Sequence, residues 1–231
     1  MRVLIIGASG MVGQGVLREC LAAADVDPVL CLGRRRLGTQ HPKLRQRIVA
    51  DLMDLSAVEP VLGSLDACFF CAGVSALGMS EAEYRRVTYD MTLGVVRTLV
   101  RVNPGLTLIY VSGAGTDSSE RGRTMWARVK GATENALLAL PCRSYMFRPA
   151  IIRPVDGVES RTRLYRIFYR LAAPLLPTLE RHLPRYITST RQVGRAMLEV
   201  ARHGAPLRVL ESVDINALQG VAAAVPPQRL L

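Results

Sequence analysis

Three glycines near the N-terminus have the spacing of a phosphate-binding loop. Gly7, Gly10 and Gly13 follow the apolar run 3–6 and lead directly into a helical pattern. Free N–H groups and the helix dipole at such a junction favour an anion, and the expected ligand is a dinucleotide. Gly7 would permit the turn, Gly10 the approach of a diphosphate, and Gly13 close packing of the helix on the sheet. The alternative is a tight turn that binds nothing.

The candidate binding residues of this loop are Gly7, Ala8, Ser9, Gly10, Met11, Val12 and Gly13. Further along the chain, Arg34, Arg35 and Arg36 follow a second strand-like run, at a place where NAD-binding proteins carry an acid for the ribose 2′-hydroxyl. Guanidinium groups pair with phosphate through two hydrogen bonds, so Arg34 and Arg35 favour NADP over NAD. The alternative is a solvated basic loop.

Two more segments belong to the expected cofactor site. Asp51 and Leu52 follow the third strand-like run, where an acid can accept a hydrogen bond from the adenine amino group. The fourth run ends in small residues, Cys71, Ala72 and Gly73, which leave room beside the adenosine half.

Strand-like and helical segments alternate along the chain. This order predicts an α/β fold with a doubly wound parallel sheet of the Rossmann type. The expected strands lie at 2–6, 28–32, 47–50, 66–71, 106–112 and 143–147, and the expected helices at 11–24, 81–102 and 123–140. We expect a dinucleotide-binding core over 1–150 and a small basic substrate lobe over 151–231. Ser189 and Gln192 form a capping box that begins a late helix, and a strand over 207–210 returns to the core.

Composition restricts the class of protein. The 231 residues are 49% hydrophobic and 21% charged, which is typical of a globular chain. No apolar run reaches the length of a membrane span and no signal peptide is recognisable, so a cytoplasmic location is expected. The odd number of cysteines, five, indicates reduced thiols. Cys68 and Cys71 have a metal-like spacing, but they lie in an apolar strand whose residues three apart point to opposite faces, so core packing is expected.

The positive charge is concentrated near the C-terminus. The net charge is +11, and residues 141–210 contain 13 arginines, no lysine and four acids. A helix over 160–172 is expected to have one apolar and one guanidinium face. It could pack on the core, cover an anionic or acyl substrate, or lie on a membrane surface. Nucleic acid is not favoured because no recognised binding module is present, and the scattered histidines predict no metal site.

Several of these motifs together resemble the short-chain dehydrogenase/reductase superfamily, in its atypical or extended branch. The order of the motifs is most similar to that of the small Tat-interacting-protein-like oxidoreductases and the NAD-dependent epimerase/dehydratase-like proteins. The segments that carry the resemblance are 7–13, 51–52, 71–73, 110–113, 126–130, 146–149 and 187–197. The resemblance implies that Pro149 and Ile151 belong to a cofactor loop after the sixth strand.

The resemblance also implies a catalytic group, which this chain matches only in part. The family uses a serine, a tyrosine and a lysine four residues after the tyrosine. Ser112 and Lys130 match, and imply a group that polarises the substrate oxygen and one that holds the nicotinamide ribose. Trp126 stands at the tyrosine position, and an indole cannot act as a general acid or base. Tyr84, Tyr89 and Tyr110 are expected to be packing residues.

Three hypotheses follow. The first is an NADP-binding reductase or epimerase that acts on a small organic substrate, with an unidentified group or water relaying the proton. The second is a regulatory protein that senses NADPH without turnover, which Trp126 favours. The third is a peripheral interaction protein that uses the arginine-rich lobe. The substrate and the oligomeric state have no signal in the sequence.

Overall fold

The structure is a computed structural model that describes residues 1–158, 183 and 185–218. The basic helix expected over 160–172 lies outside the described residues. Seven parallel strands form the central sheet, in the order β3-β2-β1-β4-β5-β6-β9. The strands are β1 (Val3–Ile6), β2 (Val29–Gly33), β3 (Leu44–Ile48), β4 (Ala67–Phe70), β5 (Thr107–Val111), β6 (Arg143–Arg148) and β9 (Val209–Glu211). The predicted doubly wound Rossmann fold is confirmed.

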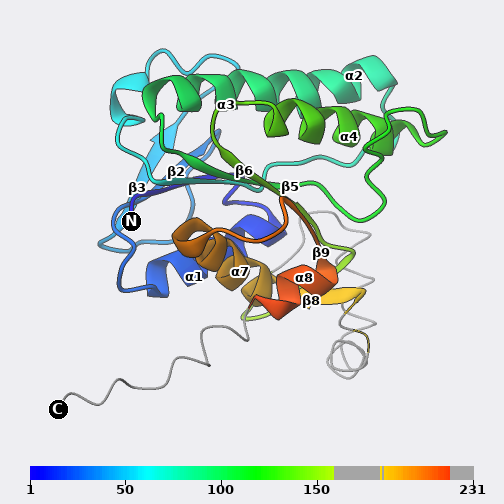
Figure 1. Ribbon diagram of the computed structural model, residues 1–231. Coiled ribbons are helices and arrows are strands. Elements are labelled where there is room, and N and C mark those ends of the chain that lie inside the picture. The colour runs from blue at the N-terminus through cyan, green and yellow to red at the C-terminus, as the bar shows by residue number, and fades with distance from the viewer. Residues whose placement is uncertain (159–182, 184, 219–231) are drawn as a thin grey trace.

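Helices cover both faces of the sheet (Figure 1). One face carries α1 (Met11–Ala22), α7 (Thr190–His203) and α8 (Ser212–Ala217). The other carries α2 (Glu81–Arg85), the π-helical segment η2 (Arg86–Asp90), α3 (Met91–Val102) and α4 (Met125–Leu138). A short 3-10 helix, η1 (Glu59–Val61), precedes β4, and β7 (Ile151–Arg153) pairs with β8 (Ile187–Ser189) in a separate parallel sheet. Among the described residues, no helix is long and apolar enough to cross a membrane.

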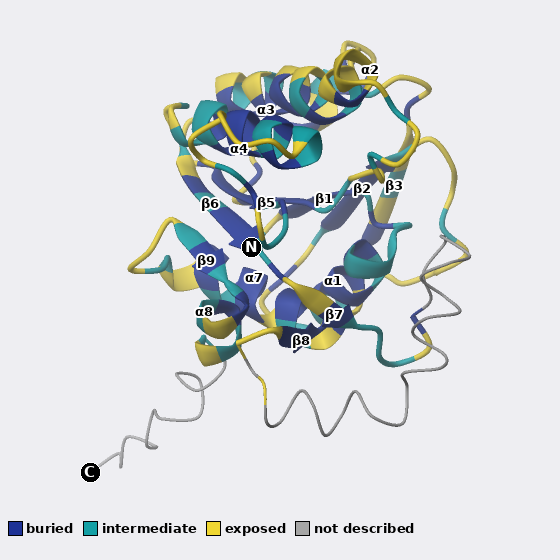
Figure 2. Cartoon of the chain, turned by 90° about the vertical axis from the view of Figure 1, so that its right-hand side faces the viewer, coloured by how far each residue is buried: buried dark blue, intermediate teal, exposed yellow. Residues whose placement is uncertain are grey.

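The sheet is buried on both faces, as Figure 2 shows. Side chains of successive strand residues alternate between two apolar clusters, because a strand has a period of two residues. In β1, Val3 and Ile5 belong to the cluster beneath α1 and α7, and the intervening Leu4 belongs to the cluster beneath α3. Cys68 and Cys71 fall on these opposite sides, so the prediction that they pack in the core and do not form a pair is confirmed.

The third strand was predicted at the wrong place. It was expected over 47–50, but β3 spans Leu44–Ile48 and pairs only with β2. An edge strand exposes much of its surface, so its residues need not be apolar. Here Arg45, Gln46 and Arg47 occupy the middle of the strand, and the short apolar run that follows them is not its signal.

Helix α7 packs closely beside α1 through small residues. A Cβ atom on Gly15 would lie 2.5 Å from Cβ of Thr190, and one on Gly194 would lie 2.9 Å from Cγ of Glu19. The start of α7 has the predicted capping box: Ser189 Oγ accepts from the Gln192 backbone N–H at 3.2 Å, and Gln192 Oε1 accepts from the Ser189 N–H at 2.8 Å. The helix that carries the glycine loop is therefore positioned by the C-terminal part of the chain.

Candidate functional site

The glycine loop joins β1 to α1 in a backbone-only turn. Gly7 has φ +85°, and a Cβ there would lie 2.5 Å from the Ala72 nitrogen, so this position admits only glycine. A Cβ on Gly13 would lie 2.2 Å from the Gly7 oxygen, which explains the close approach of helix and strand. Gly10 is the N-cap of α1, and no side chain caps the helix there. The first turn of α1 thus presents backbone N–H groups at the carboxyl end of the sheet.

A cavity of about 540 Å³ opens beside this turn, between the ends of β2, β3 and β4 and the segment η2. It brings together residues that are far apart in the sequence. The predicted cofactor residues that line it are Gly7, Ala8, Ser9, Gly10, Arg34, Arg35, Asp51, Leu52, Cys71, Ala72 and Gly73.

Four arginines surround this cavity. Arg34 and Arg35 were predicted, and the fold adds Arg47 from β3 and Arg86 from η2. Asp51 is the only acidic side chain among the described lining residues, and one of its carboxylate oxygens accepts from the Met53 N–H at 2.9 Å. We call the side chains of Arg34, Arg35, Arg47 and Arg86 the arginine rim. A strongly basic rim around a backbone cradle fits a ligand that carries several phosphates.

Several predicted residues lie outside the cavity. Met11, Val12 and Gly13 form the first turn of α1, directly after the lining residue Gly10, and are not among the residues that line the cavity. Pro149 lies after β6, where its carbonyl accepts from the Ala114 N–H at 3.0 Å. Ile151 opens β7, and its N–H donates to the Tyr186 carbonyl at 2.9 Å.

Lys130 lies farther along the same edge of the sheet, beyond the end of β5. It projects from α4, and its Nζ donates a hydrogen bond to the backbone carbonyl of Ser112. A Cβ built on Gly113 would lie 4.0 Å from that Nζ, so the ammonium is next to the glycine that follows β5. Burial lowers the pKa of Lys130 from 10.5 to about 8.

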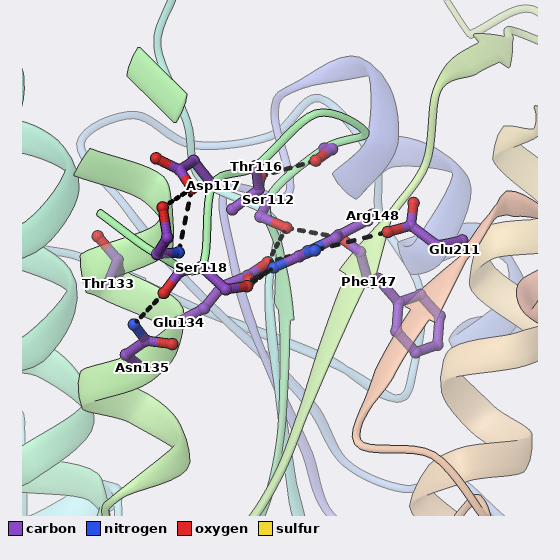
Figure 3. Close-up of polar contacts among 12 residues, drawn as sticks. Ser112, Thr116, Asp117, Ser118, Thr133, Glu134, Asn135, Phe147, Arg148 and Glu211 are labelled. Atoms are coloured by element: carbon purple, nitrogen blue, oxygen red, sulfur yellow. Dashed lines mark hydrogen bonds and ion pairs between the residues drawn. The ribbon is translucent and has the colours of Figure 1, made fainter. Parts of the chain in front are cut away.

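Ser112 does not have the free hydroxyl expected of it. Its Oγ donates to the buried carboxylate of Glu134 and lies 3.2 Å from the Phe147 carbonyl oxygen, and the residue is buried (Figure 3). A hydroxyl has one proton to donate, and here the carboxylate takes it. In this arrangement the hydroxyl proton points to Glu134, and the role of Ser112 in polarising a substrate oxygen stays a prediction. Its backbone carbonyl, which holds Lys130, is the part of Ser112 that acts on the site.

Glu134 belongs to a buried ionic network. Arg148 Nε lies 3.0 Å from Glu134 Oε1 and 3.1 Å from Oε2, and Arg148 Nη2 also bonds the same carboxylate. The Arg148 guanidinium reaches Ser118 Oγ at 2.5 Å and Glu211 at 3.6 Å, so it joins β6, the loop before α4 and the end of β9 (Figure 3). The hydrogen bond with Glu134 raises the pKa of Arg148. We call Ser112, Glu134 and Arg148 the buried ionic network.

The tyrosines Tyr84, Tyr89 and Tyr110 are packing residues, as predicted. Tyr84 and Tyr110 are buried, and burial raises the pKa of both phenols. Tyr89 stacks under the Arg85 guanidinium, whose carbon lies 4.1 Å from the ring centroid. The end of the Trp126 indole lies against Gly115, where an added Cβ would be 3.4 Å from the ring.

Sequence reasoning missed Arg47, Arg86, Glu134 and Arg148. Glu134 had a local signal, because it lies four residues after Lys130 on the same helix face. The π-helical turn that presents Arg86 to the cavity had no recognisable signal in the sequence.

A seven-stranded doubly wound sheet with a backbone cradle at the first helix defines a Rossmann-type dinucleotide-binding protein. Residues 3–131, more than half of the chain, match the NAD dependent epimerase/dehydratase family, and the chain belongs to that family. An NAD(P) nucleotide is the cofactor typical of the family.

Two curated relatives support this assignment. "Protein FMP52, mitochondrial" of Eremothecium gossypii is 28% identical over 227 residues, covering 94% of this chain and 97% of the relative. "Protein HTATIP2" of Rattus norvegicus is 28% identical over 163 residues, covering 69% of this chain and 65% of the relative.

Solved structures share the fold. Gre2 of Candida albicans, in complex with NADPH, has a TM-score of 0.68 at 15% identity and covers 91% of this chain and 78% of its own. The enzyme WbmF of Bordetella bronchiseptica, in complex with NAD⁺, has a TM-score of 0.62 at 14% identity. The match covers 100% of this chain and 81% of WbmF. At this level of identity the likeness concerns the fold alone.

Proposed function

We propose that this chain binds NADP(H) in preference to NAD(H) and acts as a reductase or epimerase on a small organic substrate. The observation that carries the cofactor preference is the arginine rim. Arg34 and Arg35 stand after β2, where an acid would grip a ribose 2′-hydroxyl, and Arg47 adds a third guanidinium on the neighbouring strand. A 2′-phosphate would be bound there by charge-assisted hydrogen bonds.

The residues present fit the cofactor along the edge of the sheet. The glycine turn would hold the diphosphate, and the small residues 71–73 would lie beside the adenosine. Lys130, beyond the next strand, would hold the nicotinamide ribose. When bound, the nicotinamide supplies or accepts a hydride equivalent.

The single tryptophan of the chain makes the cofactor test direct. Trp126 fluorescence, titrated with NADPH and with NADH, reports both affinities. We expect tighter binding of NADPH, and the Arg34→Ala/Arg35→Ala variant should lose about 10- to 100-fold of its affinity for NADPH with little change for NADH. Arg45→Ala is the matched control. Arg45 also lies on β3, but its guanidinium donates to the nearby Pro42 carbonyl and does not line the cavity. Equal affinities in the unmodified protein would defeat the proposal.

A non-catalytic NADPH sensor is the second candidate. Two observations favour it: Trp126 occupies the tyrosine position, and the Ser112 hydroxyl is taken by Glu134. This candidate predicts tight NADPH binding with no oxidation of NADPH by any carbonyl compound. Turnover that appears only in Trp126→Tyr would favour it, whereas turnover in the unmodified chain would exclude it.

A further inference from the structure

Reduction of a carbonyl compound requires a proton as well as a hydride equivalent, and few groups near the ends of β5 and β6 can give one. The Trp126 indole does not titrate usefully. The Tyr110 phenol is buried with a raised pKa, and the Ser112 hydroxyl is bonded to Glu134. Thr116 donates to the Gly113 carbonyl at 2.7 Å. Among the described residues of this edge, these groups are therefore poor proton donors.

Lys130 differs from all of them in position and charge. It is partly exposed, and its ammonium lies beside Gly113 at the end of β5, where an added Cβ would be 4.0 Å from Nζ. The Ser112 carbonyl accepts only one of its three N–H protons in the interactions described. Lys130 also lies one helical turn after Trp126, on the same face of α4.

From this placement we infer that Lys130 is itself the acid–base catalyst of this chain, in addition to holding the ribose. This inference rests on the proposed reductase function. In carbonyl reduction, the Lys130 ammonium gives a proton to the substrate oxygen as the new C–H bond forms from the hydride equivalent of NADPH. The lysine becomes a neutral amine and recovers its proton from water. In the oxidative direction the neutral amine accepts the alcohol proton.

The surroundings of Lys130 suit proton exchange near neutral pH. Burial lowers its pKa to about 8, and the Glu134 carboxylate on the next turn of α4 opposes that shift. Arg148 from β6 pairs with Glu134, and Glu211 after β9 pairs with Arg148. Since Arg148 neutralises much of the Glu134 field, the carboxylate does not fix the ammonium in its charged state.

Direct titration is the first test, and the composition makes it simple. Lys43 and Lys130 are the only lysines in the chain. Isotope labelling of lysine therefore gives two ε-carbon NMR signals, and Lys43→Arg assigns the remaining signal to Lys130. The expected midpoint in the free protein is near pH 8. A midpoint at the ordinary value of 10.5 would overturn the inference.

Kinetics of matched variants give the second test. NADPH binding and NADPH oxidation are measured with benzaldehyde, nitrobenzaldehyde and cyclohexanone as probes. Lys130→Arg keeps a cation but holds its proton too tightly, so it should still bind NADPH and lose about 100-fold or more of the turnover. Lys43→Arg, the same substitution at a lysine that bonds the carbonyls of Leu21 and Ala23, should change neither.

The rates should also depend on pH, and the outcome that overturns this inference differs from the one that overturns the proposed function. The reduction rate should fall as the pH rises through about 8, and the oxidation rate should rise over the same range. Full turnover in Lys130→Arg with NADPH bound would overturn the inference and leave the cofactor proposal intact. NADPH binding without turnover on any probe would also overturn it, and would favour the sensor. Absence of NADPH binding would overturn the proposed function itself.

Discussion

The two halves of the candidate site are built in different ways. Around β1, β2 and β4, the cavity is formed by backbone and small residues, with guanidiniums only at its rim. Around β5 and β6, charged side chains lie in the interior and bond one another. The first half is suited to bind a large anion from solution, because its guanidinium groups and the backbone N–H groups of the glycine turn lie at an open cavity. The second is suited to hold one ammonium in place, because its groups are already satisfied.

The largest expected effect comes from breaking the buried ionic network. Arg148→Met leaves the Glu134 carboxylate buried without its partner and should lower the free energy of unfolding by about 3–5 kcal/mol. The measurement is urea unfolding followed by circular dichroism. The double variant Glu134→Met/Arg148→Met should recover most of the loss. As a control, Arg101→Met breaks the exposed pair with Glu59 and should have a much smaller effect. Equal losses in the two single variants would show that the interior pair is not special.

The glycine turn should separate folding from ligand binding. Gly13→Ala places a Cβ against the Gly7 carbonyl and should cost about 1–3 kcal/mol of stability. Gly10→Ala meets only the Gly7 oxygen, at 3.4 Å, so the fold should tolerate it while NADPH binding weakens about tenfold or more. Thermal unfolding and NADPH titration of both variants check this. A Gly10→Ala protein with unchanged NADPH affinity would place the diphosphate elsewhere.

Stability should depend on pH through Lys130. Its folded pKa is lowered to about 8, so between that pH and 10.5 the unfolded chain binds more protons than the folded one. The free energy of unfolding of the natural chain, relative to Lys130→Met, should therefore rise by about 1–3 kcal/mol over this range and stay constant below it. Urea unfolding at several pH values measures it, with Lys43→Met as control. A flat difference would mean that the ammonium is solvated.

The smallest effect is expected at the far side of the arginine rim. Arg86→Gln should weaken NADPH binding about tenfold, since it removes one charge from the cavity wall. Arg85→Gln is the matched control, because the preceding arginine stacks on Tyr89 and does not line the cavity. Equal effects of the two substitutions would indicate only a loss of general positive charge.

What the sequence could predict follows the same division. The turn at Gly7 and the arginines after β2 are local patterns, and the structure places them in one cavity. The predicted bounds of β3 were wrong because an exposed edge strand has no apolar signature. The orientation of Ser112 could not be read from the sequence, since it depends on Glu134, 22 residues away, and on Arg148 from another strand. Such interior bonds arise only when distant segments pack together.

The contact of Gly15 with Thr190 has a consequence for how the chain can be divided. The first 150 residues contain every strand of the seven-stranded sheet except β9, yet one side of α1 packs directly against α7. A fragment truncated after β6 would leave Val16 and Cys20 more open to water and the glycine turn without its support. We therefore expect that the N-terminal segment does not fold on its own, and that transplanting the turn into another scaffold would require the distant C-terminal helix as well.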